Sequence, residues 1–414
     1  MQVKAVMLHG KNDLHYETFD LREIEEDEIL TKVICDSACM STYKYIQRIP
    51  ETGSEGFSPV VTGHELAAEV IRAGEKAAHL YKPGDKFCVQ AAMDIGGAKV
   101  APGYHFPEFG GNATYNIVPA EVARSEYILK FDNMPFYKAS LCEPYACILF
   151  AFYSNFHTRD FEKQNRMGIL EDGKLTIMGG CGPMGLGGVE LLLNMAVRPS
   201  LIVVTDVNEE RINYAKKVIP EEYAAGKGIE LVYVNTSGPD PVRVLNDITG
   251  GTGFDDIFIM CPVKDVIEQA DAVCGFDGCI NFFSGPVDKS FCASVNFFDV
   301  HYKRKHIIGS ASSGVEDMIE ILKMSEDEGF RTEVMVTHVG GLNSAEALLR
   351  DFPSVPGGKK LIYSNIDMEL TAIGDFGKKE DPLFQKLHEI CQRHDSLWSG
   401  EAEDYLLEHG KPIL

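Results

Sequence analysis

The sequence predicts an α/β protein with two parts, a compact β-rich part and a doubly wound parallel sheet. The first observation is that residues 1–130 contain short β-type segments separated by Gly, Pro, Asp and Asn. The second is a regular alternation of strand and helix patterns that begins near Lys174. The third is a cluster of glycines at 179–188, between the first of those strands and the helix that follows.

The β-rich part begins at the start of the chain. The spacing of its segments is typical of an antiparallel domain, and Lys82-Pro83-Gly84-Asp85 predicts a turn into one strand. The predicted strands are 3–8, 28–34, 67–73, 85–90, 113–117 and 127–130. From residue 137 to about 156 the pattern becomes apolar and helical.

In the second part of the chain, from Lys174, each strand pattern is followed by a helix pattern, and this alternation predicts a parallel sheet. The predicted strands are 175–178, 201–205, 231–235, 256–260, 278–283 and 306–310. The predicted helices between them are 185–195, 209–218, 240–249 and 263–273. Beyond them we expect helices at 314–329, 344–352 and 383–394, and a strand at 360–363.

The glycine cluster contains a motif for binding a dinucleotide. Gly180, Gly182 and Gly185 form the pattern G-x-G-x-x-G, with Pro183 and Met184 inside it. At a strand-to-helix turn, this pattern lets backbone N–H groups and the helix N-terminus hold a pyrophosphate. The alternative is a glycine-rich turn in an unrelated α/β fold.

An acidic residue follows at the expected place. Asp206 ends the next strand, 21 residues after Gly185. A carboxylate there accepts hydrogen bonds from ribose hydroxyls and repels a 2′-phosphate, so we predict NAD, with NADP as the alternative. Arg211, five residues later, would flank the adenine, whereas in an unrelated fold Asp206 would simply cap a helix. We assign residues 156–339 to a Rossmann dinucleotide-binding domain.

Four residues in the first part are candidate ligands of a catalytic Zn²⁺. Cys39 lies upstream, His64 and Glu65 are adjacent, and Glu143 lies downstream. A thiolate, an imidazole and carboxylates suit zinc, which in catalytic sites keeps one position for water or substrate. Their separation along the chain leaves alternatives open. Singly, His64 suits a core or turn, Cys39 a small buried apolar site, and Glu143 a helix start.

These motifs together resemble the zinc-dependent medium-chain alcohol and polyol dehydrogenases. The resemblance covers roughly residues 1–365, by order and spacing of the motifs. The shared motifs are Cys39-x-Ser41, Gly63-His64-Glu65, Pro83-Gly84-Asp85, Glu143-Pro144, the glycine turn and Asp206 with Arg211. The resemblance implies a GroES-like catalytic domain from residues 1–155 and 340–414, including a C-terminal extension, beside the Rossmann domain.

The resemblance also implies roles for single residues. Cys39 and His64 would bind zinc, Glu65 would complete the site directly or through water, and Glu143 would exchange onto the metal. Ser41 would relay the proton that accompanies hydride transfer, although a Ser there also suits a turn or helix cap. Tyr45 falls where sorbitol dehydrogenases carry a substrate-contacting Tyr, or it is a packed aromatic.

Several positions depart from the usual family pattern. Region 88–115 contains a single cysteine, so we predict one catalytic zinc and no structural zinc. Thr42 and Lys44 replace an Asp and a His, and residues 310–312 lack a polyol-binding Arg. These departures, together with the stretches HYKRKHIIGSASSG at 301–314 and THVGGLNSAEALL at 337–349, resemble the L-sorbose-1-phosphate reductase branch. Members of that branch interconvert a ketose phosphate and a hexitol phosphate.

A phosphorylated substrate would need a cation near the site. Lys44 or Arg48 would meet its phosphate, unless both are ordinary surface cations. The basic block 303–305 is either a second phosphate site or a solvated corner. A same-class alternative is a sorbitol- or threonine-type dehydrogenase with an unphosphorylated substrate. An alternative of another class is a non-catalytic NAD-binding structural relative.

The composition of the chain limits which kinds of binding partner are plausible. The net charge of −23 disfavours nucleic acids and anionic membranes. Eleven cysteines, an odd number, and an N-terminus without a signal pattern predict a reducing cytoplasm. The apolar window 175–197 suits a buried Rossmann element better than a membrane span. We expect a homo-oligomer, a dimer or a tetramer.

Overall fold

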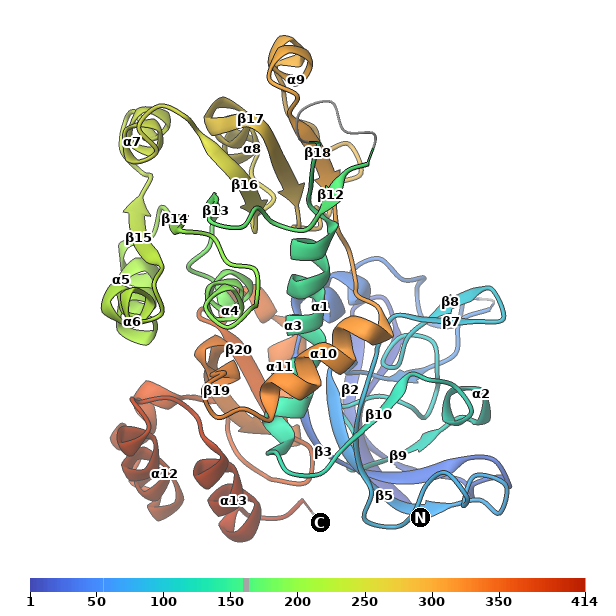
Figure 1. The fold of residues 1–414 in the computed structure, drawn as a ribbon. Helices are drawn as coiled ribbons and strands as arrows, with labels where there is room; N and C mark the ends of the chain where they lie inside the picture. The colour runs from blue at the N-terminus through green and yellow to red at the C-terminus, as the bar shows by residue number, and fades with distance from the viewer. Residues whose placement is uncertain (55, 159–163, 414) are drawn as a thin grey trace. The chain divides into compact units, whose positions relative to one another are not determined.

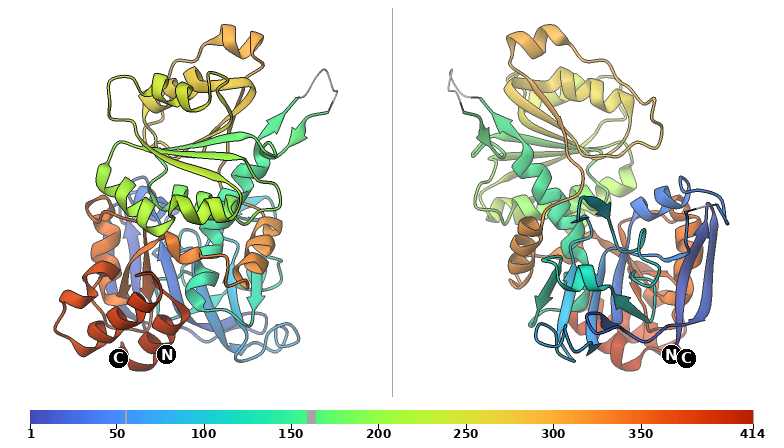
Figure 2. Two further views of the ribbon diagram at one scale, coloured as in Figure 1. Left: turned by 60° about the vertical axis from the view of Figure 1, so that its left-hand side comes forward. Right: turned by 90° about the vertical axis from the view of Figure 1, so that its right-hand side faces the viewer.

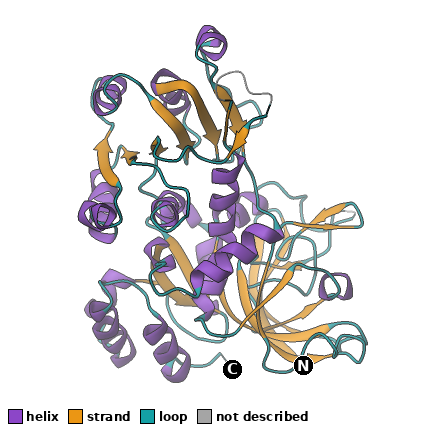
Figure 3. Cartoon of the chain, viewed as in Figure 1, coloured by secondary structure: helices purple, strands orange, loops and turns teal. Residues whose placement is uncertain are grey.

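The computed structural model describes residues 1–54, 56–158 and 164–413, and the chain forms two compact units (Figure 1). Unit 1 joins Met1–Pro144 to Gly314–Leu414, and unit 2 is Tyr145–Ser313. Unit 1 is rich in strands, whereas unit 2 alternates strands and helices (Figure 3). The α/β class predicted from the sequence is confirmed. Among the described residues, no helix combines the length and the apolar character needed to cross a bilayer.

Unit 1 is organised around one large sheet. Its strand order is β10-β6-β5-β3-β20-β19-β21, with β9 also pairing with β3. A second sheet has the order β2-β1-β4, and β7 and β8 form a hairpin. The strands are β1 Gln2–Gly10, β2 Asp13–Asp20, β3 Ile29–Ala38, β4 Val60–Val61, β5 Leu66–Ala73, β6 Lys86–Val89, β7 Met93–Ile95, β8 Ala98–Val100, β9 Tyr115–Val118, β10 Ile128–Phe131, β19 Val336–Gly341, β20 Lys359–Tyr363 and β21 Thr371–Ala372.

Both ends of the chain contribute to unit 1, and both termini lie on the same side of it (Figure 2). β20 pairs antiparallel with β3, so that Cys35 lies opposite Tyr363. The helices of this unit are α1 Met40–Ile46, α2 Ala120–Ala123, α10 Val315–Ser325, α11 Ala345–Arg350, α12 Pro382–Arg393 and α13 Gly400–His409. Helix α3, Phe136–Ser154, begins in unit 1 and ends in unit 2.

Unit 2 is a six-stranded parallel sheet with the order β15-β14-β13-β16-β17-β18. In chain order this is 3-2-1-4-5-6, the arrangement of a Rossmann sheet, so the doubly wound prediction is confirmed. Its strands are β13 Lys174–Met178, β14 Leu201–Asp206, β15 Glu230–Asn235, β16 Phe254–Ile259, β17 Cys274–Phe282 and β18 His306–Gly309, with a small separate pair β11 Phe156–His157 and β12 Arg166–Met167. Its helices are α4 Pro183–Leu192, α5 Glu209–Val218, α6 Glu221–Gly226, α7 Pro241–Ile248, α8 Lys264–Val273 and α9 Phe297–Tyr302.

The structure differs from the sequence-based expectation in where the parts are divided. Residues 314–339, which we assigned to the Rossmann part, belong to unit 1. The reason is that β19 hydrogen-bonds to β20 and β21 of the large sheet. The pattern did not predict the strands β2, β4, β7, β8, β11, β12 and β21 or the helices α1, α2, α6, α9 and α13. Strand β2 forms because the tight turn after Gly10 folds it back onto β1.

Candidate active site

Unit 1 contains a candidate metal site where β3 ends and its paired strand β5 begins. Cys39 follows β3 and is the N-cap of α1, where its Sγ accepts a hydrogen bond from the backbone N–H of Ser41 at 3.4 Å. His64 and Glu65 immediately precede β5, which pairs with β3. Gly63 turns the chain before them at φ 95°, and a Cβ there would meet the backbone N of Asn112 at 2.8 Å. Sheet register thus brings the two segments together.

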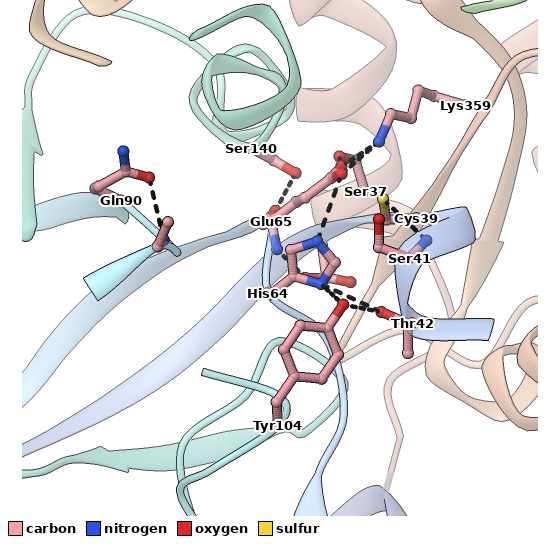
Figure 4. A network of polar contacts seen from close by, with 12 residues as sticks. Ser37, Cys39, Ser41, Thr42, His64, Glu65, Gln90, Tyr104, Ser140 and Lys359 are labelled. Carbon is pink, nitrogen blue, oxygen red and sulfur yellow. Dashed lines mark hydrogen bonds and ion pairs between the residues drawn. The ribbon is translucent and has the colours of Figure 1, made fainter. Parts of the chain in front are cut away.

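Three potential metal ligands converge in this place (Figure 4). One ligand atom from each of Cys39, His64 and Glu65 lies within 4.8 Å of the others. His64 and Glu65 are buried, and Cys39 is partly exposed. A soft sulfur, an imidazole nitrogen and a carboxylate oxygen form a donor set that fits Zn²⁺.

His64 is oriented by two hydroxyl groups on its Nδ1 side. Tyr104 Oη lies 2.9 Å and Thr42 Oγ1 3.2 Å from Nδ1. Burial raises the pKa of Tyr104 well above its ordinary value, so its phenol stays neutral. A proton on Nδ1 donated to these oxygens leaves Nε2 with its lone pair for a metal. Nε2 lies 3.9 Å from an oxygen of Glu65.

Glu65 is almost inaccessible to solvent, and its charge is compensated by a lysine from the far end of the chain. Lys359 Nζ lies 2.5 Å and 2.6 Å from the two carboxylate oxygens. Ser37 also donates to the carboxylate, and the backbone carbonyl of Glu65 accepts from Ser140 Oγ at 2.6 Å. Burial, the largest single influence, would lower the pKa of Lys359. The charges of Glu65, Cys39 and Glu143 and the hydrogen bond to Glu65 together outweigh it, so the pKa is raised and Lys359 stays charged.

The surroundings of the cluster disfavour uncompensated negative charge. Burial raises the pKa of the Cys39 thiol to about 12, with Glu65 and Glu143 adding to the rise and Lys359 opposing it. Burial likewise raises the pKa of Asp36, which accepts from the backbone N–H of Glu65 at 3.1 Å, to about 7. A bound cation would stabilise the thiolate, because metal binding releases the ligand proton.

The other predicted site residues of unit 1 lie around this cluster. Glu143 is half-buried on α3 and acts on Cys39 and Lys359 through its charge, but it is not among the three converging ligands. Ser41 lies exposed in the first turn of α1. The hydroxyl of Tyr45 donates to the backbone carbonyl of Tyr104 at 2.9 Å, and the two rings pack with centroids 4.5 Å apart.

Unit 2 contains a candidate site of its own, the glycine turn between β13 and α4. A Cβ on Gly185 would lie 2.1 Å from the carbonyl oxygen of Gly180, so this packing needs glycine. A Cβ on Gly182 would meet nothing within 4 Å, which leaves open space at the helix N-terminus. Pro183 and Met184 form the first turn of α4, where proline is well tolerated. This geometry suits an anionic group at the N-terminus of α4.

Asp206 and Arg211 lie near the same turn. Asp206 is buried at the end of β14, and its Oδ1 accepts from the backbone N–H groups of Val207 and Asn208 at 2.8 Å and 3.0 Å. Arg211 is exposed on α5. Burial raises the pKa of the Cys181 thiol inside the glycine turn to about 12, and the charge of Asp206 adds to this rise while that of Arg211 opposes it.

The basic block 303–305 holds charges that are already compensated. Lys305 is buried against Asp271 at 2.9 Å and Asp299 at 3.3 Å. Lys303 pairs with Asp299 at 2.8 Å, and the guanidinium of Arg304 lies over the ring of Phe276. This block therefore has an evident structural role.

Residues 183–327 match the zinc-binding dehydrogenase family. Along nearly its whole length, the chain is 41% identical to mannitol-1-phosphate 5-dehydrogenase from Aliivibrio fischeri, covering 98% of each protein. It is 36% identical to L-sorbose 1-phosphate reductase from Klebsiella pneumoniae, covering 99% of this chain and 98% of that protein. The chain belongs to the zinc-binding dehydrogenase family. The family predicted from the sequence is thus confirmed, and the protein is an enzyme of the dehydrogenase and reductase class.

The fold agrees with this membership. An alcohol dehydrogenase from Escherichia coli CFT073, solved in complex with NADH, superimposes with a TM-score of 0.69 at 17% identity. The match covers 87% of this chain and 99% of that one. At 17% identity, this similarity shows only that the two dehydrogenase chains share a fold.

Sequence reasoning missed Lys359, Tyr104 and Ser37, which contact the candidate ligands. A signal for Lys359 was present, because Lys359 and Lys360 stand side by side in a strand whose residues are all buried. A buried lysine needs a charged or polar partner. Tyr104 lies in an irregular loop, and no sequence pattern connects it with His64.

Proposed function

We propose that this enzyme transfers hydride between NAD(H) and a ketose phosphate/hexitol phosphate pair, with one zinc ion per chain. The observation that carries the proposal is the convergence of Cys39, His64 and Glu65 within 4.8 Å. The phosphorylated substrate is supported by two relatives that span nearly the full chain and are named for mannitol 1-phosphate and L-sorbose 1-phosphate.

In this proposal Cys39, His64 and Glu65 would hold the zinc, and Glu143 would be available to it as an exchanging ligand. When bound, zinc polarises a carbonyl group and stabilises negative charge on the substrate oxygen. The exposed hydroxyl of Ser41 exchanges the proton of that oxygen with solvent. Tyr45, held by its bond to the Tyr104 carbonyl, forms part of the wall that faces the substrate.

The test is a screen for consumption of NADH with a panel of ketose phosphates and unphosphorylated ketoses, with and without a chelator. We expect turnover of one or more ketose phosphates, loss of turnover after chelation, and recovery on adding Zn²⁺. Elemental analysis should give one zinc per chain. Faster turnover of free sugars would favour a sorbitol- or threonine-type dehydrogenase instead.

Asp206 predicts preference for NADH over NADPH by about 10²-fold in kcat/KM, because its carboxylate repels a 2′-phosphate. Asp206→Ala should bring the ratio of the two kcat/KM values close to one. Asp265→Ala, which removes an exposed carboxylate from α8, serves as the control and should leave the ratio unchanged. A wild-type enzyme that prefers NADPH would contradict this assignment.

We propose Lys44 and Arg48, on and just after α1, as contacts of the substrate phosphate. Lys44 lies in the last turn of α1, the short helix whose N-cap is Cys39. Lys44→Ala and Arg48→Ala should each lower kcat/KM for a ketose phosphate by about 10- to 100-fold and spare the free ketose. Lys11→Ala, at an exposed lysine paired with Glu51, is the control. Equal losses on both substrates would refute the phosphate contact.

We also propose a homo-oligomer in which a second copy covers the aromatic residues of α9. Phe297, Phe298 and Tyr302 are 75%, 67% and 63% exposed, and the edge strand β18 lies in the same unit. An edge strand has backbone groups available for pairing with another chain. The double variant Phe297→Ser, Phe298→Ser should lower the mass measured by light scattering to that of one chain. Val244→Ser, at an exposed residue of α7, should not.

A further inference from the structure

The C-terminal extension, which begins at Ile366, places a buried carboxylate in the interior of unit 1. Glu403, on α13, is 1% exposed. Its Oε1 accepts from the backbone N–H of Phe136 at 2.6 Å, and its Oε2 from that of Tyr137 at 2.8 Å. Oε2 also accepts from the hydroxyl of Tyr363 at 2.8 Å. One side chain of the extension therefore joins two other elements, α3 and β20.

The bonds to α3 satisfy groups that the helix itself leaves without partners. Phe136 and Tyr137 are the first two residues of α3, and the first N–H groups of a helix have no acceptor within it. A carboxylate is also favourable beside the positive end of the helix dipole. Burial raises the pKa of Glu403 to about 7, and the three donors oppose that rise. Glu403 thus caps the N-terminus of α3, although it lies 266 residues from Tyr137 along the chain.

The same two elements hold Glu65. Ser140, one turn into α3, donates to the backbone carbonyl of Glu65 at 2.6 Å. Lys359, at the start of β20, contacts both carboxylate oxygens of Glu65. Alternate residues of a strand point to the same face, so Lys359 and Tyr363 share one face of β20. The elements that Glu403 joins are therefore those that fix the main chain and the carboxylate of Glu65.

The only tryptophan of the chain belongs to this assembly. Trp398 is fully buried, and its Nε1–H donates to the hydroxyl oxygen of Tyr363 at 2.8 Å. The Tyr363 hydroxyl in turn donates to Glu403. Trp398 is therefore an intrinsic probe of the bond between the extension and β20.

We propose that the C-terminal extension braces the metal site, with Glu403 a positioning residue that holds α3 and β20 and thereby sets Glu65 beside Cys39 and His64. This inference rests on the proposed zinc-binding function. It assigns the extension a part in metal binding. Zinc affinity and the environment of Trp398 should then be linked.

The first test compares Glu403→Gln and Tyr363→Phe with wild type by competition for zinc against a chromophoric chelator. Glu403→Gln should raise the Kd for zinc about 10- to 100-fold, the range typical of groups that orient metal ligands. Tyr363→Phe should also raise the Kd for zinc, and it replaces Glu403→Gln in this test if that variant does not fold. The matched control is Glu401→Gln, on the same helix, whose exposed carboxylate pairs with Arg393 and His394. It should leave the Kd unchanged.

The second test is the Trp398 fluorescence of zinc-free protein during titration with Zn²⁺. The emission of the wild type should change and saturate with the zinc site, and Glu403→Gln should abolish this response. A role in folding alone would not link the emission to zinc. Two results would refute the positioning role of Glu403 without touching the proposed function. One is wild-type protein that binds zinc without a change in Trp398 emission. The other is a folded Glu403→Gln variant with the wild-type Kd for zinc. Wild-type protein that binds no zinc would overturn the proposed function as well.

Discussion

Replacing Cys39 with alanine should remove bound zinc and lower kcat/KM by a factor on the order of 10³ or more. Cys39 supplies the sulfur donor of the three converging ligands, and no other described cysteine belongs to that group. Without a thiolate, the imidazole of His64 and the carboxylate of Glu65 remain, and Glu65 is already paired with Lys359. Elemental analysis and steady-state kinetics on one preparation would measure both effects.

The control for this experiment is Cys292→Ala. Cys292 is an exposed cysteine of unit 2, so its loss should change neither zinc content nor turnover. Circular dichroism should show that Cys39→Ala is folded, because Cys39 lies at the N-cap of a helix of only seven residues. A folded Cys39→Ala variant with full zinc and full activity would refute the metal assignment.

Replacing Lys359 with methionine should lower the free energy of unfolding of the zinc-free protein by about 3–5 kcal/mol. The side chains of Lys359 and Glu65 are 5% and 1% exposed, so the variant would leave the carboxylate buried without a countercharge. Desolvating an unpaired charge is costly, and Ser37 offers it a single neutral donor. Urea denaturation followed by circular dichroism would give the difference.

Two further variants test whether loss of the Lys359–Glu65 ion pair causes the lower free energy of unfolding. Lys386→Met removes an exposed lysine that pairs with Glu389 on α12, and it should change stability little. The double variant Lys359→Met, Glu65→Leu removes both charges, and it should be more stable than Lys359→Met alone. A Lys359→Met variant as stable as the wild type would show that Lys359 does not compensate the buried charge of Glu65.

The parts of this protein that depend on local pattern could be predicted from the sequence. The alternation of strands and helices in unit 2 and the glycine turn at 180–185 each lie within a short window, and both predictions of fold agree with the structure. Cys39, His64 and Glu65 could be named because each belongs to a short motif, and the register of β3 with β5 brings them together.

The remaining features depend on contacts between distant segments. Lys359 reaches Glu65 across 294 residues, and only the pairing of β20 with β3 makes the contact possible. Residues 314–339 look like a continuation of the alternating pattern, yet hydrogen bonds of β19 place this stretch with the large sheet. Tyr104 comes from an irregular loop, and its partner His64 follows from tertiary packing alone.

The large sheet of unit 1 takes β3 and β5 from the start of the chain and β19, β20 and β21 from near its end. The strands of unit 2, by contrast, are contiguous along the chain. On the ribosome, the Rossmann sheet can therefore close while the catalytic sheet still lacks its central partner strand. Glu65 and the other candidate metal ligands of the cluster are synthesised early, but the lysine that neutralises Glu65 emerges only after all of unit 2 has been made. Nascent chains arrested before β20 should accordingly bind nucleotide before they can build a zinc site.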